Sequence, residues 1–464
     1  MNSTSVSDLL WMLAYLGLLL GAGYALLCVL GGPARRTPAE IFGLSILMGC
    51  GGVPFLHFWL SLAGVQPSRM LLSLLLFVVV AGVAWLGRAR RWVKPAEFWP
   101  NLTRADALGL PSLVLLLWAA GLIAYSTFTY PLVEWDAFAI WGFKAKVLYS
   151  APLPALQNYF QDASLGFSHL DYPLLVPFLT AGGYAAMGAV NDTLGKAPGY
   201  FLFLGLIVFL YGAVRSRLGR PVALALVALF ASAPIVVRWA SVGTADLPLA
   251  AFFAGSAVYA TRWLAGGEKS DLRLAAFFGA AGVFTKNEGL PMAVITLVVV
   301  LAFGRGRRRP AGSFPQELAP ALAALVCLLP WAIFRHGLPH IDENYPSHLN
   351  PTTVAANWPR WRLILGYFCY NTFDPIPYYC LWVLALGAFL LGQLQRAGAA
   401  PWILLALLAG VGLADGLAYL ISPQPLEQLL LVTLDRLLLQ VLPVAVLLTA
   451  FSLAPIFPVE LRQD

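Results

Sequence analysis

The sequence predicts an all-α protein that crosses a membrane many times. Of its 464 residues, 60% are apolar and only 11% are charged, and both fractions lie far from those of soluble domains. Apolar runs of roughly 17 to 25 residues recur along the whole chain, and each can cross about 30 Å of hydrocarbon as a helix. Helices satisfy their own backbone hydrogen bonds where no water is present. We therefore expect about thirteen transmembrane helices.

The first four spans are expected at about residues 8–31, 39–63, 69–87 and 108–130. Basic residues follow the first span at Arg35-Arg36 and the third span from Arg88 to Lys94. The positive-inside rule places both of these loops in the cytoplasm. The N-terminus and the stretch after the fourth span are therefore expected on the outer side.

Residues 173–190 are apolar, short and rich in glycine and proline, and we expect an interfacial or re-entrant helix there. The next span, 196–217, ends in the basic turn Arg215 to Arg220 and therefore runs inward. Later spans alternate in direction and are expected at 221–240, 245–264, 272–285, 288–304, 317–335, 377–394, 400–421 and 437–456. The cluster Arg305 to Arg309 then also lies inside, as does the C-terminus.

This alternation divides the chain into three parts. Residues 1–107 hold three additional N-terminal helices, residues 108–456 form a core, and residues 457–464 form a short cytoplasmic tail. The core has outer loops at 131–195 and 336–376, with amphipathic helices expected at the outer face, and the second loop is a candidate lid. The net charge of +7 comes from basic residues beside apolar runs, so it indicates orientation in a membrane and no nucleic-acid partner.

Asp136 is the centre of the most prominent polar cluster, directly after the fourth span. It precedes a segment, 137–149, whose apolar and aromatic positions suit an amphipathic helix on the membrane surface. Asp136 is either the cap of this helix or a carboxylate in a partly dry cleft that serves as a catalytic base. Trp135 and Trp141 are either stacking surfaces for a sugar ring or aromatic residues of the membrane interface.

Other charged residues on the expected outer side are candidates for the same site. His169 and Asp171 are able to share a proton or a divalent cation, although a capped helix beginning at Pro173 explains the pattern equally. Asp246 lies between two spans, where an ionised group costs about 2.5 to 3.5 kcal/mol, and a turn with a cap is its alternative role. Lys286 is expected to bind phosphate or to pair with Asp246 or Glu288.

Arg436 is expected at the start of the last span. Its planar guanidinium suits bidentate contacts with a phosphate group, and snorkelling to the interface is the alternative. A Walker loop, a GxGxxG fingerprint, an HExxH motif and a GxSxG elbow are all missing from the sequence, so nucleotide binding and serine or zinc hydrolysis have no support.

In this order, the features resemble the GT-C glycosyltransferases, particularly the group of lipid A aminoarabinose transferases, protein O-mannosyltransferases and lipopolysaccharide sugar transferases. The resemblance covers about residues 108–456. It rests on an acid opening the first outer loop (Asp136), a Pro-Leu helix (Asp171 to Leu175), a second acid (Asp246), a lysine at a span end (Lys286) and an arginine before a proline-containing apolar run (Arg436 to Pro443). The chain departs from the family in having Glu134-Trp135-Asp136-Ala137 where an Asp-Glu pair is common.

The resemblance implies transfer of a hexose or pentose from a polyprenyl-phosphate donor to a hydroxyl of a lipid, glycan or protein. The reaction would invert the anomeric carbon at the outer face of a bacterial inner membrane. Asp136 and Asp246 would be catalytic, while Arg436, Lys286 and Lys144 would bind the donor phosphate. The sugar or acceptor would contact Trp135, Trp141, His169, Asp171 and Tyr172, and a divalent cation is compatible with Asp246 or with His169 and Asp171.

Two other function classes stay open. A transporter or flippase of lipid-linked sugars typically shows paired repeats and broken helices near the midplane, whereas the polar groups here gather at one face. A polysaccharide polymerase or ligase at the outer face typically relies on arginines in a large outer loop. In this chain, the long loop has only Arg335, Arg360 and Arg362 at its margins.

Overall fold

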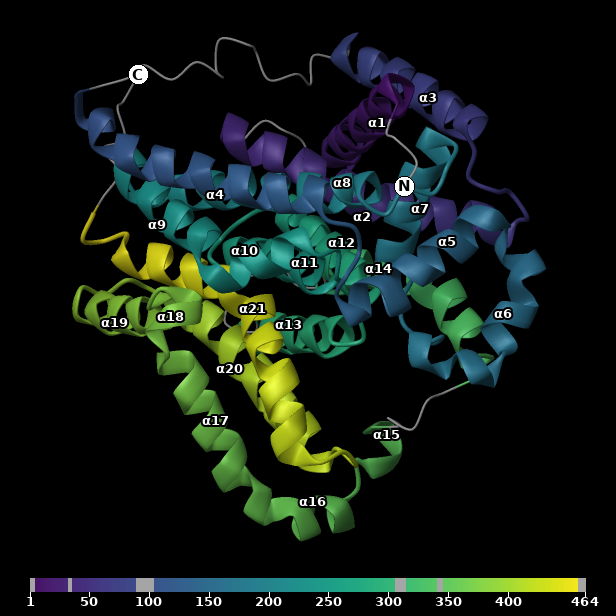
Figure 1. Cartoon of the computed structure of the whole chain (residues 1–464). Coiled ribbons are helices and arrows are strands. Elements are labelled where there is room, and N and C mark those ends of the chain that lie inside the picture. Colours follow the sequence, from purple (N-terminus) through teal and green to yellow (C-terminus); the bar gives the residue numbers. More distant parts are fainter. Residues whose placement is uncertain (1–4, 32–35, 89–103, 305–313, 340–344, 458–464) are drawn as a thin grey trace.

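The computed structural model describes residues 5–31, 36–88, 104–304, 314–339 and 345–457. Within these ranges the chain forms helices and no strand, which agrees with the predicted fold class. Figure 1 shows the helices packed in several directions around α11 and α12. The predicted cluster Arg305 to Arg309, most of the cluster from Arg88 to Lys94 and the tail after residue 457 lie outside the described residues.

The longer helices are α1 (Val6–Leu30), α2 (Pro38–Leu62), α3 (Arg69–Arg88), α4 (Leu110–Thr129), α8 (Ala197–Arg215), α11 (Asp246–Leu264), α14 (Phe314–His336), α20 (Ala400–Ile421) and α21 (Leu426–Leu453). The shorter ones that matter here are α5 (Phe143–Ser150), α7 (Leu175–Met187), α9 (Arg220–Ser232), α10 (Pro234–Ser241), α12 (Lys269–Val283), α13 (Gly289–Gly304), α15 (Tyr345–His348), α16 (Pro351–Asn357), α17 (Trp361–Phe373), α18 (Pro375–Tyr378) and α19 (Leu381–Leu394).

Seven helices of the described ranges are long and apolar enough to cross a membrane, or eight if the bent pair α9 and α10 counts as one span. They are α1, α2, α3, α4, α8, α20 and α21. The predicted number of about thirteen is not confirmed, because several apolar runs fold as short helices. α12, α13 and α19 have 15, 16 and 14 residues. At 1.5 Å per residue they are about 21 to 24 Å long, less than the roughly 30 Å of hydrocarbon.

The predicted span 377–394 is shortened by its backbone. Tyr379 and Cys380 adopt left-handed conformations, with φ of 47° and 60°, which L-residues rarely adopt and which interrupt a right-handed helix. α18 therefore ends at Tyr378, and α19 begins only at Leu381.

The N-terminal helices pack tightly against each other and against the rest of the bundle. At Gly23 and Gly49, where α1 crosses α2, an added Cβ would collide with the backbone of the partner helix. Small residues permit this close approach, which is a common way to associate helices in membranes. α2 in turn packs against α7 and α8, so the predicted additional helices of residues 1–107 are in direct contact with the core.

α7 occupies the region expected to be interfacial or re-entrant. It has 13 residues, about 20 Å, and twelve of them are buried. It lies against α1, α2 and α5. The helix is therefore short, as expected, but it is enclosed by other helices and has no broad face open to its surroundings.

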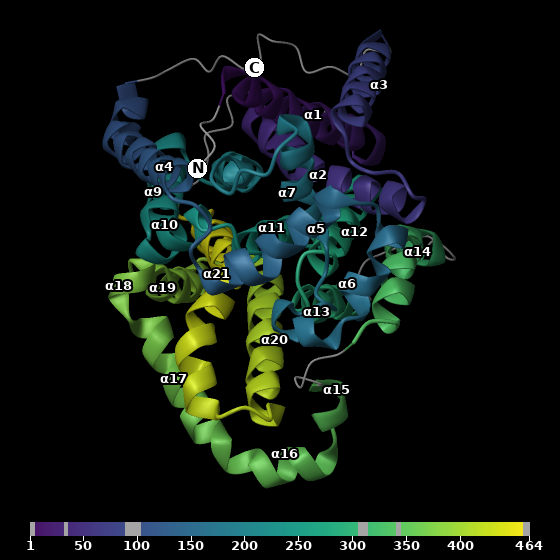
Figure 2. The same cartoon turned by 45° about the vertical axis from the view of Figure 1, so that its right-hand side comes forward.

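The C-terminal third departs most from the prediction. α21 begins at Leu426, eleven residues before the predicted span 437–456, so Arg436 lies inside the helix and not at its start. The predicted outer loop 336–376 contains α15, α16 and α17, and Figure 2 shows α16 and α17 beside the hairpin of α20 and α21. α16 packs against α20, and α17 packs against α20 and α21. A lid formed by the loop 336–376 stays a prediction.

Candidate functional site

Asp246 is the centre of a buried polar network at the beginning of α11. Its side chain is fully buried and accepts hydrogen bonds from three residues. Lys286 Nζ donates to Oδ1 at 2.9 Å, and Gln440 Nε2 donates to the same oxygen at 2.9 Å. Arg436 donates to Oδ2 through Nε at 3.1 Å and Nη2 at 2.8 Å. The carboxylate is thereby held as an anion whose two oxygens both have donors.

Arg436 connects this carboxylate to a second one. Its remaining terminal nitrogen, Nη1, lies 2.6 Å from Oδ2 of Asp136. The guanidinium also lies over the ring of Trp239, 4.7 Å from the centroid. α10, which carries Trp239, is bent by 62° from α9, and this bend turns the Trp239 ring towards α21. Arg436 is consequently fixed by two carboxylates at its edges and by an aromatic ring at its face.

Lys286 extends the network in the other direction. It lies in the turn between α12 and α13, and its Nζ is 2.7 Å from Oε1 of Glu288 as well as in contact with Asp246. Burial disfavours the charged amine, but Asp246 and Glu288 outweigh burial, so the pKa of Lys286 is raised above its usual value. Lys286 is thus a protonated cation between two acids.

We call these residues the Asp246 network: Asp136, Asp246, Lys286, Glu288, Arg436 and Gln440. Their side-chain exposure increases outward from the centre, from 0% at Asp246 to 9% at Lys286 and 13% at Arg436, and then to 27% at both Asp136 and Glu288. The network therefore has a dry centre and two carboxylates that a substrate is able to reach.

The backbone at Asp136 differs from the predicted amphipathic surface helix. Asp136–Gly142 is a turn of π-helix that continues into α5, and such turns are frequent at functional sites. The capping position is Trp135, with no side-chain capping hydrogen bond. Asp136 thus pairs with Arg436 in place of capping the helix. Because most of 137–145 is buried, a helix lying on the membrane surface is not confirmed here.

Lys144 lies in a separate cluster. Its Nζ is fully buried and donates to the carbonyl oxygens of Ser168 at 2.6 Å and His169 at 2.5 Å. It also lies over the rings of Trp141 and Tyr172. Burial lowers the pKa of Lys144 to about 7, although Asp171 acts in the opposite direction. In this position the amine ties the loop 168–172 to α5 and does not face the Asp246 network.

The remaining predicted residues surround Lys144 or lie on the surface. Asp171 pairs with Arg335 at 3.2 Å, and the ring of His169 packs on Tyr172 at 4.4 Å. Trp141 is buried, whereas 59% of Trp135 is exposed. Among the described residues, no group of three or more His, Cys, Asp or Glu side chains is arranged to hold a metal ion, and both oxygens of Asp246 are occupied by cationic or amide donors.

Gln440, Trp239 and Asp415 were not predicted as site residues from the sequence. Gln440 is one helical turn after Arg436. If the last helix had been predicted to begin before Arg436, the i, i+4 spacing would have put both side chains on one face and Gln440 beside Asp246. Trp239 carries no charge, and nothing in the sequence around it indicates a site residue. Asp415 is buried within the apolar helix α20 and interacts electrostatically with Glu288 and Lys286; an acid in an apolar run is itself a signal.

Part of the chain matches a family of known proteins. Residues 171–334 match the family model of dolichyl-phosphate-mannose-protein mannosyltransferases, which belong to the GT-C glycosyltransferases. The matched segment is about a third of the chain; it contains Asp171, Asp246 and Lys286, whereas Asp136 and Arg436 lie outside it. No curated protein and no solved structure matches the chain significantly. The match and the apolar helices together indicate an integral membrane protein of the glycosyltransferase type.

Proposed function

We propose that this chain transfers a sugar from a polyprenyl-phosphate donor to an acceptor hydroxyl, with the Asp246 network as its active site. The observation that supports this most directly is the position of Arg436 between Asp136 and Asp246. Together with Lys286, it places two cations next to a reachable carboxylate. The transfer needs both elements: a base for the acceptor and positive charge for the departing phosphate.

The proposed reaction is a single displacement. The acceptor oxygen attacks the anomeric carbon and gives its proton to Asp136. The bond between the anomeric carbon and the phosphate oxygen breaks, and its electron pair stays on the phosphate. Attack opposite to the departing group inverts the anomeric carbon. Arg436 and Lys286 stabilise the charge that develops on the phosphate, which is usually the larger contribution in a water-poor site.

The pairing of Asp136 with Arg436 couples donor binding to this proton transfer. Nη1 of Arg436 holds Asp136 at 2.6 Å, and a donor phosphate that takes this nitrogen releases the carboxylate for the acceptor. Asp246 keeps Nε and Nη2 of the same guanidinium, so the arginine stays in place during the exchange. Asp246 is on this view a positioning residue, and Asp136 becomes available as a base only when donor is present.

The donor class and the location of the reaction follow from the same proposal. The matched family is named for a dolichyl-phosphate-mannose donor, so mannose on a polyprenyl phosphate is the first donor to test, with a lipid, glycan or protein hydroxyl as acceptor. We further propose that the Asp246 network lies at the outer face of a cytoplasmic membrane, which the positive-inside rule supports through the basic residues that follow the first, third and 196–217 spans.

Proteoliposomes supplied with polyprenyl-phosphate [³H]mannose and a membrane extract as acceptor test this proposal. Asp136→Asn should lower the rate of transfer by about 10² to 10⁴-fold, the usual contribution of a general base, without preventing folding. Glu134→Gln is the matched control, because Glu134 pairs with Arg238 on the exposed side of the same turn.

Three outcomes would contradict the assignment. Wild-type rates in Asp136→Asn would exclude this residue as the base. Loss of transfer in Glu288→Gln but not in Asp136→Asn would move the role to the other accessible acid. Movement of the labelled lipid across the bilayer without product would favour a flippase.

A further inference from the structure

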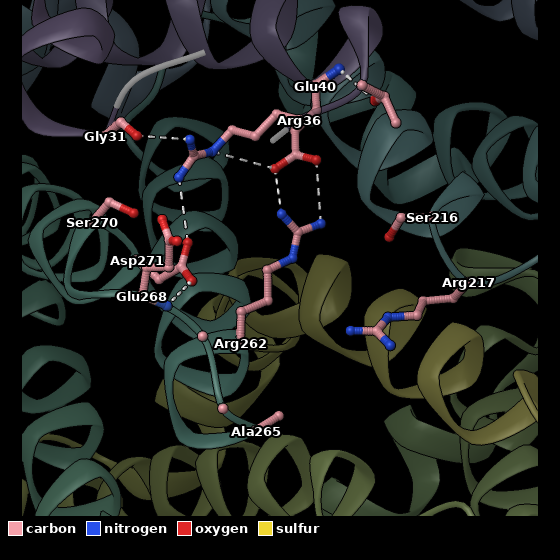
Figure 3. A pocket seen from close by; sticks show the side chains of 13 residues that line it. Gly31, Arg36, Glu40, Ser216, Arg217, Arg262, Ala265, Glu268, Ser270 and Asp271 are labelled. Carbon is pink, nitrogen blue, oxygen red and sulfur yellow. Dashed lines mark hydrogen bonds and ion pairs between the residues drawn. The ribbon is translucent and has the colours of Figure 1, made fainter. Parts of the chain in front are cut away.

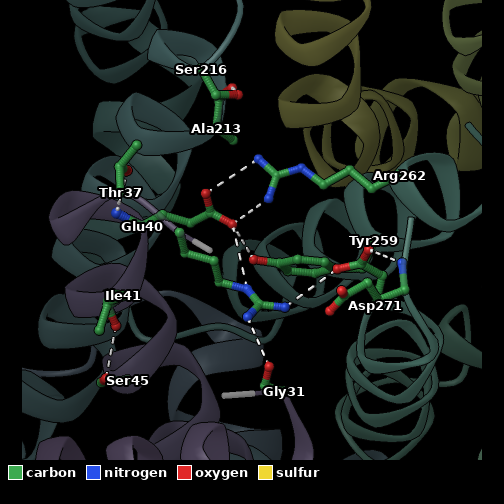
Figure 4. A network of polar contacts seen from close by, with 12 residues as sticks. Gly31, Thr37, Glu40, Ile41, Ser45, Ala213, Ser216, Tyr259, Arg262 and Asp271 are labelled. Carbon is green, nitrogen blue, oxygen red and sulfur yellow. Dashed lines mark hydrogen bonds and ion pairs between the residues drawn. The ribbon is translucent and has the colours of Figure 1, made fainter. Parts of the chain in front are cut away.

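A second charged network lies at the other end of α11. Glu40, in the first turn of α2, accepts hydrogen bonds from both terminal nitrogens of Arg262 and from the hydroxyl of Tyr259. Arg36 pairs with Asp271 at 3.3 Å and lies 3.9 Å from Glu40. Figure 4 shows Glu40, Tyr259, Arg262 and Asp271 converging between α2, α11 and α12, and Figure 3 shows Arg36 beside Glu40 and Asp271. We call these five residues the Glu40 network.

This network borders a cavity of about 570 Å³. The cavity is lined by Gly31, Arg36, Thr37, Glu40, Ser216, Arg217, Arg262, Ala265, Gly266, Gly267, Glu268, Ser270 and Asp271. Arg262, the first residue of α11 that lines the cavity, is sixteen positions after Asp246, which is roughly 24 Å along the helix at 1.5 Å per residue. The cavity is therefore remote from the proposed active site and lies on the predicted cytoplasmic side.

Arg217 differs from the other arginines of the cavity. Arg36 and Arg262 have carboxylate partners, whereas the side chain of Arg217 has no hydrogen bond or ion pair with any described residue, and its Nε is buried. One face of its guanidinium packs on Phe451, 4.4 Å from the ring centroid. Figure 3 shows the side chain extending from the end of α8 towards Arg262. A partly buried guanidinium with unused donors is costly unless an anion accepts from it.

The acids that line the cavity do not supply that anion. Glu40 is engaged by Arg262 and Tyr259, and Asp271 by Arg36. Glu268 is exposed at the rim, where it forms a capping box at the start of α12. The side-chain N–H groups of Arg217 are therefore left without an acceptor among the described residues, and Arg262 beside it has N–H groups beyond the two used by Glu40.

We propose that this cavity binds a phosphoryl group between Arg217 and Arg262. Two guanidinium groups at one side of a cavity match a tetrahedral dianion with several acceptor oxygens. The volume accommodates more than a bare phosphate ion, so a phosphate ester fits. An apolar groove of about 970 Å³ begins at the same first turn of α12, at Lys269, Leu272 and Arg273, which offers a place for the chains of a lipid. The ester is accordingly either a lipid head group or a soluble phosphate.

Thermal unfolding of the detergent-purified full chain tests this proposal. The probes are inorganic phosphate at constant ionic strength, dihexanoyl phosphatidic acid, and dihexanoylglycerol as a lipid without phosphate. We expect the first two to raise Tm and the third to have no effect. Half-maximal stabilisation at lower concentration by phosphatidic acid identifies a lipid head group, and equal response to both phosphates identifies a soluble ligand.

Variants then assign the effect to the cavity. Arg217→Gln should weaken the response about tenfold or more, since hydrogen bonds to charged groups contribute at least that much. Arg215→Gln is the matched control, because it removes the same charge two residues earlier and does not line the cavity. The proposal would be overturned by any of three results. These are a rise in the Tm of the wild type with dihexanoylglycerol, no rise in Tm with either phosphate compound, and an unchanged rise in Tm in Arg217→Gln.

A measurement on the unmodified chain covers the case in which Arg217→Gln does not fold. Phenylglyoxal modifies accessible arginines, and peptide mass spectrometry reports each site separately. Phosphate should protect Arg217 at least several-fold more than Arg215. Equal protection of both residues would contradict binding in the cavity.

Discussion

The two ends of α11 carry networks that are built from the same chemical groups but differ in their accessibility. Each has one buried carboxylate that receives two hydrogen bonds from an arginine: Asp246 from Arg436, and Glu40 from Arg262. In the Glu40 network, the carboxylates of Glu40 and Asp271 are only 2% and 13% exposed. In the Asp246 network, Asp136 and Glu288 are each 27% exposed.

This difference separates a structural role from a chemical one. A carboxylate enclosed by donors holds helices in register but does not accept a proton from a substrate. A carboxylate at the edge of such a network has a fixed position and is also reachable. Arg436 provides both properties, because it is held by Asp246 while its last nitrogen holds Asp136.

Removal of the central acids should give the largest effects. Asp246→Asn leaves Arg436 and Lys286 buried with too little negative charge, and Glu40→Gln does the same to Arg262 and Arg36. Each should lower the free energy of unfolding by about 3 to 5 kcal/mol, the usual cost of leaving one buried partner unpaired. Thermal or denaturant unfolding of the purified variants measures this loss.

Activity should distinguish the same two variants. At a temperature where both remain folded, Asp246→Asn should abolish sugar transfer, because Arg436 loses its anchor. Glu40→Gln should keep transfer within about tenfold of the wild type. Comparable losses in both variants would show that the two ends of α11 are not functionally distinct.

Arg436→Lys is expected to have the next largest effect. Lysine keeps the charge but loses the planar fork that contacts Asp136 and Asp246 at once. We expect kcat/KM for the lipid-linked donor to fall by about 10² to 10³-fold, in the range for loss of one stabilising donor. Arg262→Lys makes the same replacement in the Glu40 network. A larger loss of transfer in Arg262→Lys than in Arg436→Lys would contradict the assignment of the active site.

Lys144 differs from Arg436 and Arg262, because it has no ion pair with a described carboxylate. Burial lowers its pKa from 10.5 to about 7. Between pH 7 and about 10, the unfolded state therefore binds more protons than the folded state, and stability should rise with pH. The slope for one such group is at most about 1.4 kcal/mol per pH unit. Lys144→Met should remove it, as measured by unfolding across this range.

Lys146→Met is the control for Lys144, since Lys146 is partly exposed and pairs with Asp192. It should leave the pH dependence unchanged. An identical slope in wild type and Lys144→Met would mean that the carbonyl oxygens of Ser168 and His169 keep the amine charged throughout.

The sequence allowed one of the two networks to be anticipated. Asp136, Asp246, Lys286 and Arg436 were recognisable because charges are scarce in an apolar chain and these four fall on one predicted side. Glu40 and Arg262 were not recognised, because a charge near a span end is also the ordinary signal of membrane orientation. Only the packing of α2 against α11 and α12 shows that they meet.

The helix boundaries were harder to predict for a related reason. Hydropathy does not distinguish a segment buried in lipid from one buried in protein, so α7 and α19 were predicted as longer apolar segments, and the short apolar runs of α12 and α13 were predicted as spans. Conversely, the first turns of α21 resemble a loop in sequence, because they contain the polar residues Glu427, Gln428 and Asp435. In the structure, α17 and α20 pack against this helix. The error at α21 also concealed the helical spacing between Arg436 and Gln440.

Substitution of Gln440 is expected to change stability and sugar transfer the least. Its Nε2 donates to Asp246, but its Oε1 is buried without a hydrogen-bond partner among the described residues. Gln440→Leu removes one favourable hydrogen bond together with one unsatisfied acceptor, and these contributions are similar in size. We expect a change in stability within about 1 kcal/mol and less than a tenfold loss of sugar transfer.

Tyr259→Phe is the counterpart at the other end of α11, because it removes one donor from Glu40 and leaves Arg262 in place. It leaves no unsatisfied group on the tyrosine side, so a loss of about 1.5 to 3 kcal/mol is expected from the missing hydrogen bond to a charged group, with no change in transfer. If Gln440→Leu is as damaging as Asp246→Asn, then all the donors to Asp246 are needed to position Arg436, and the active site depends on the complete set of hydrogen bonds at Asp246.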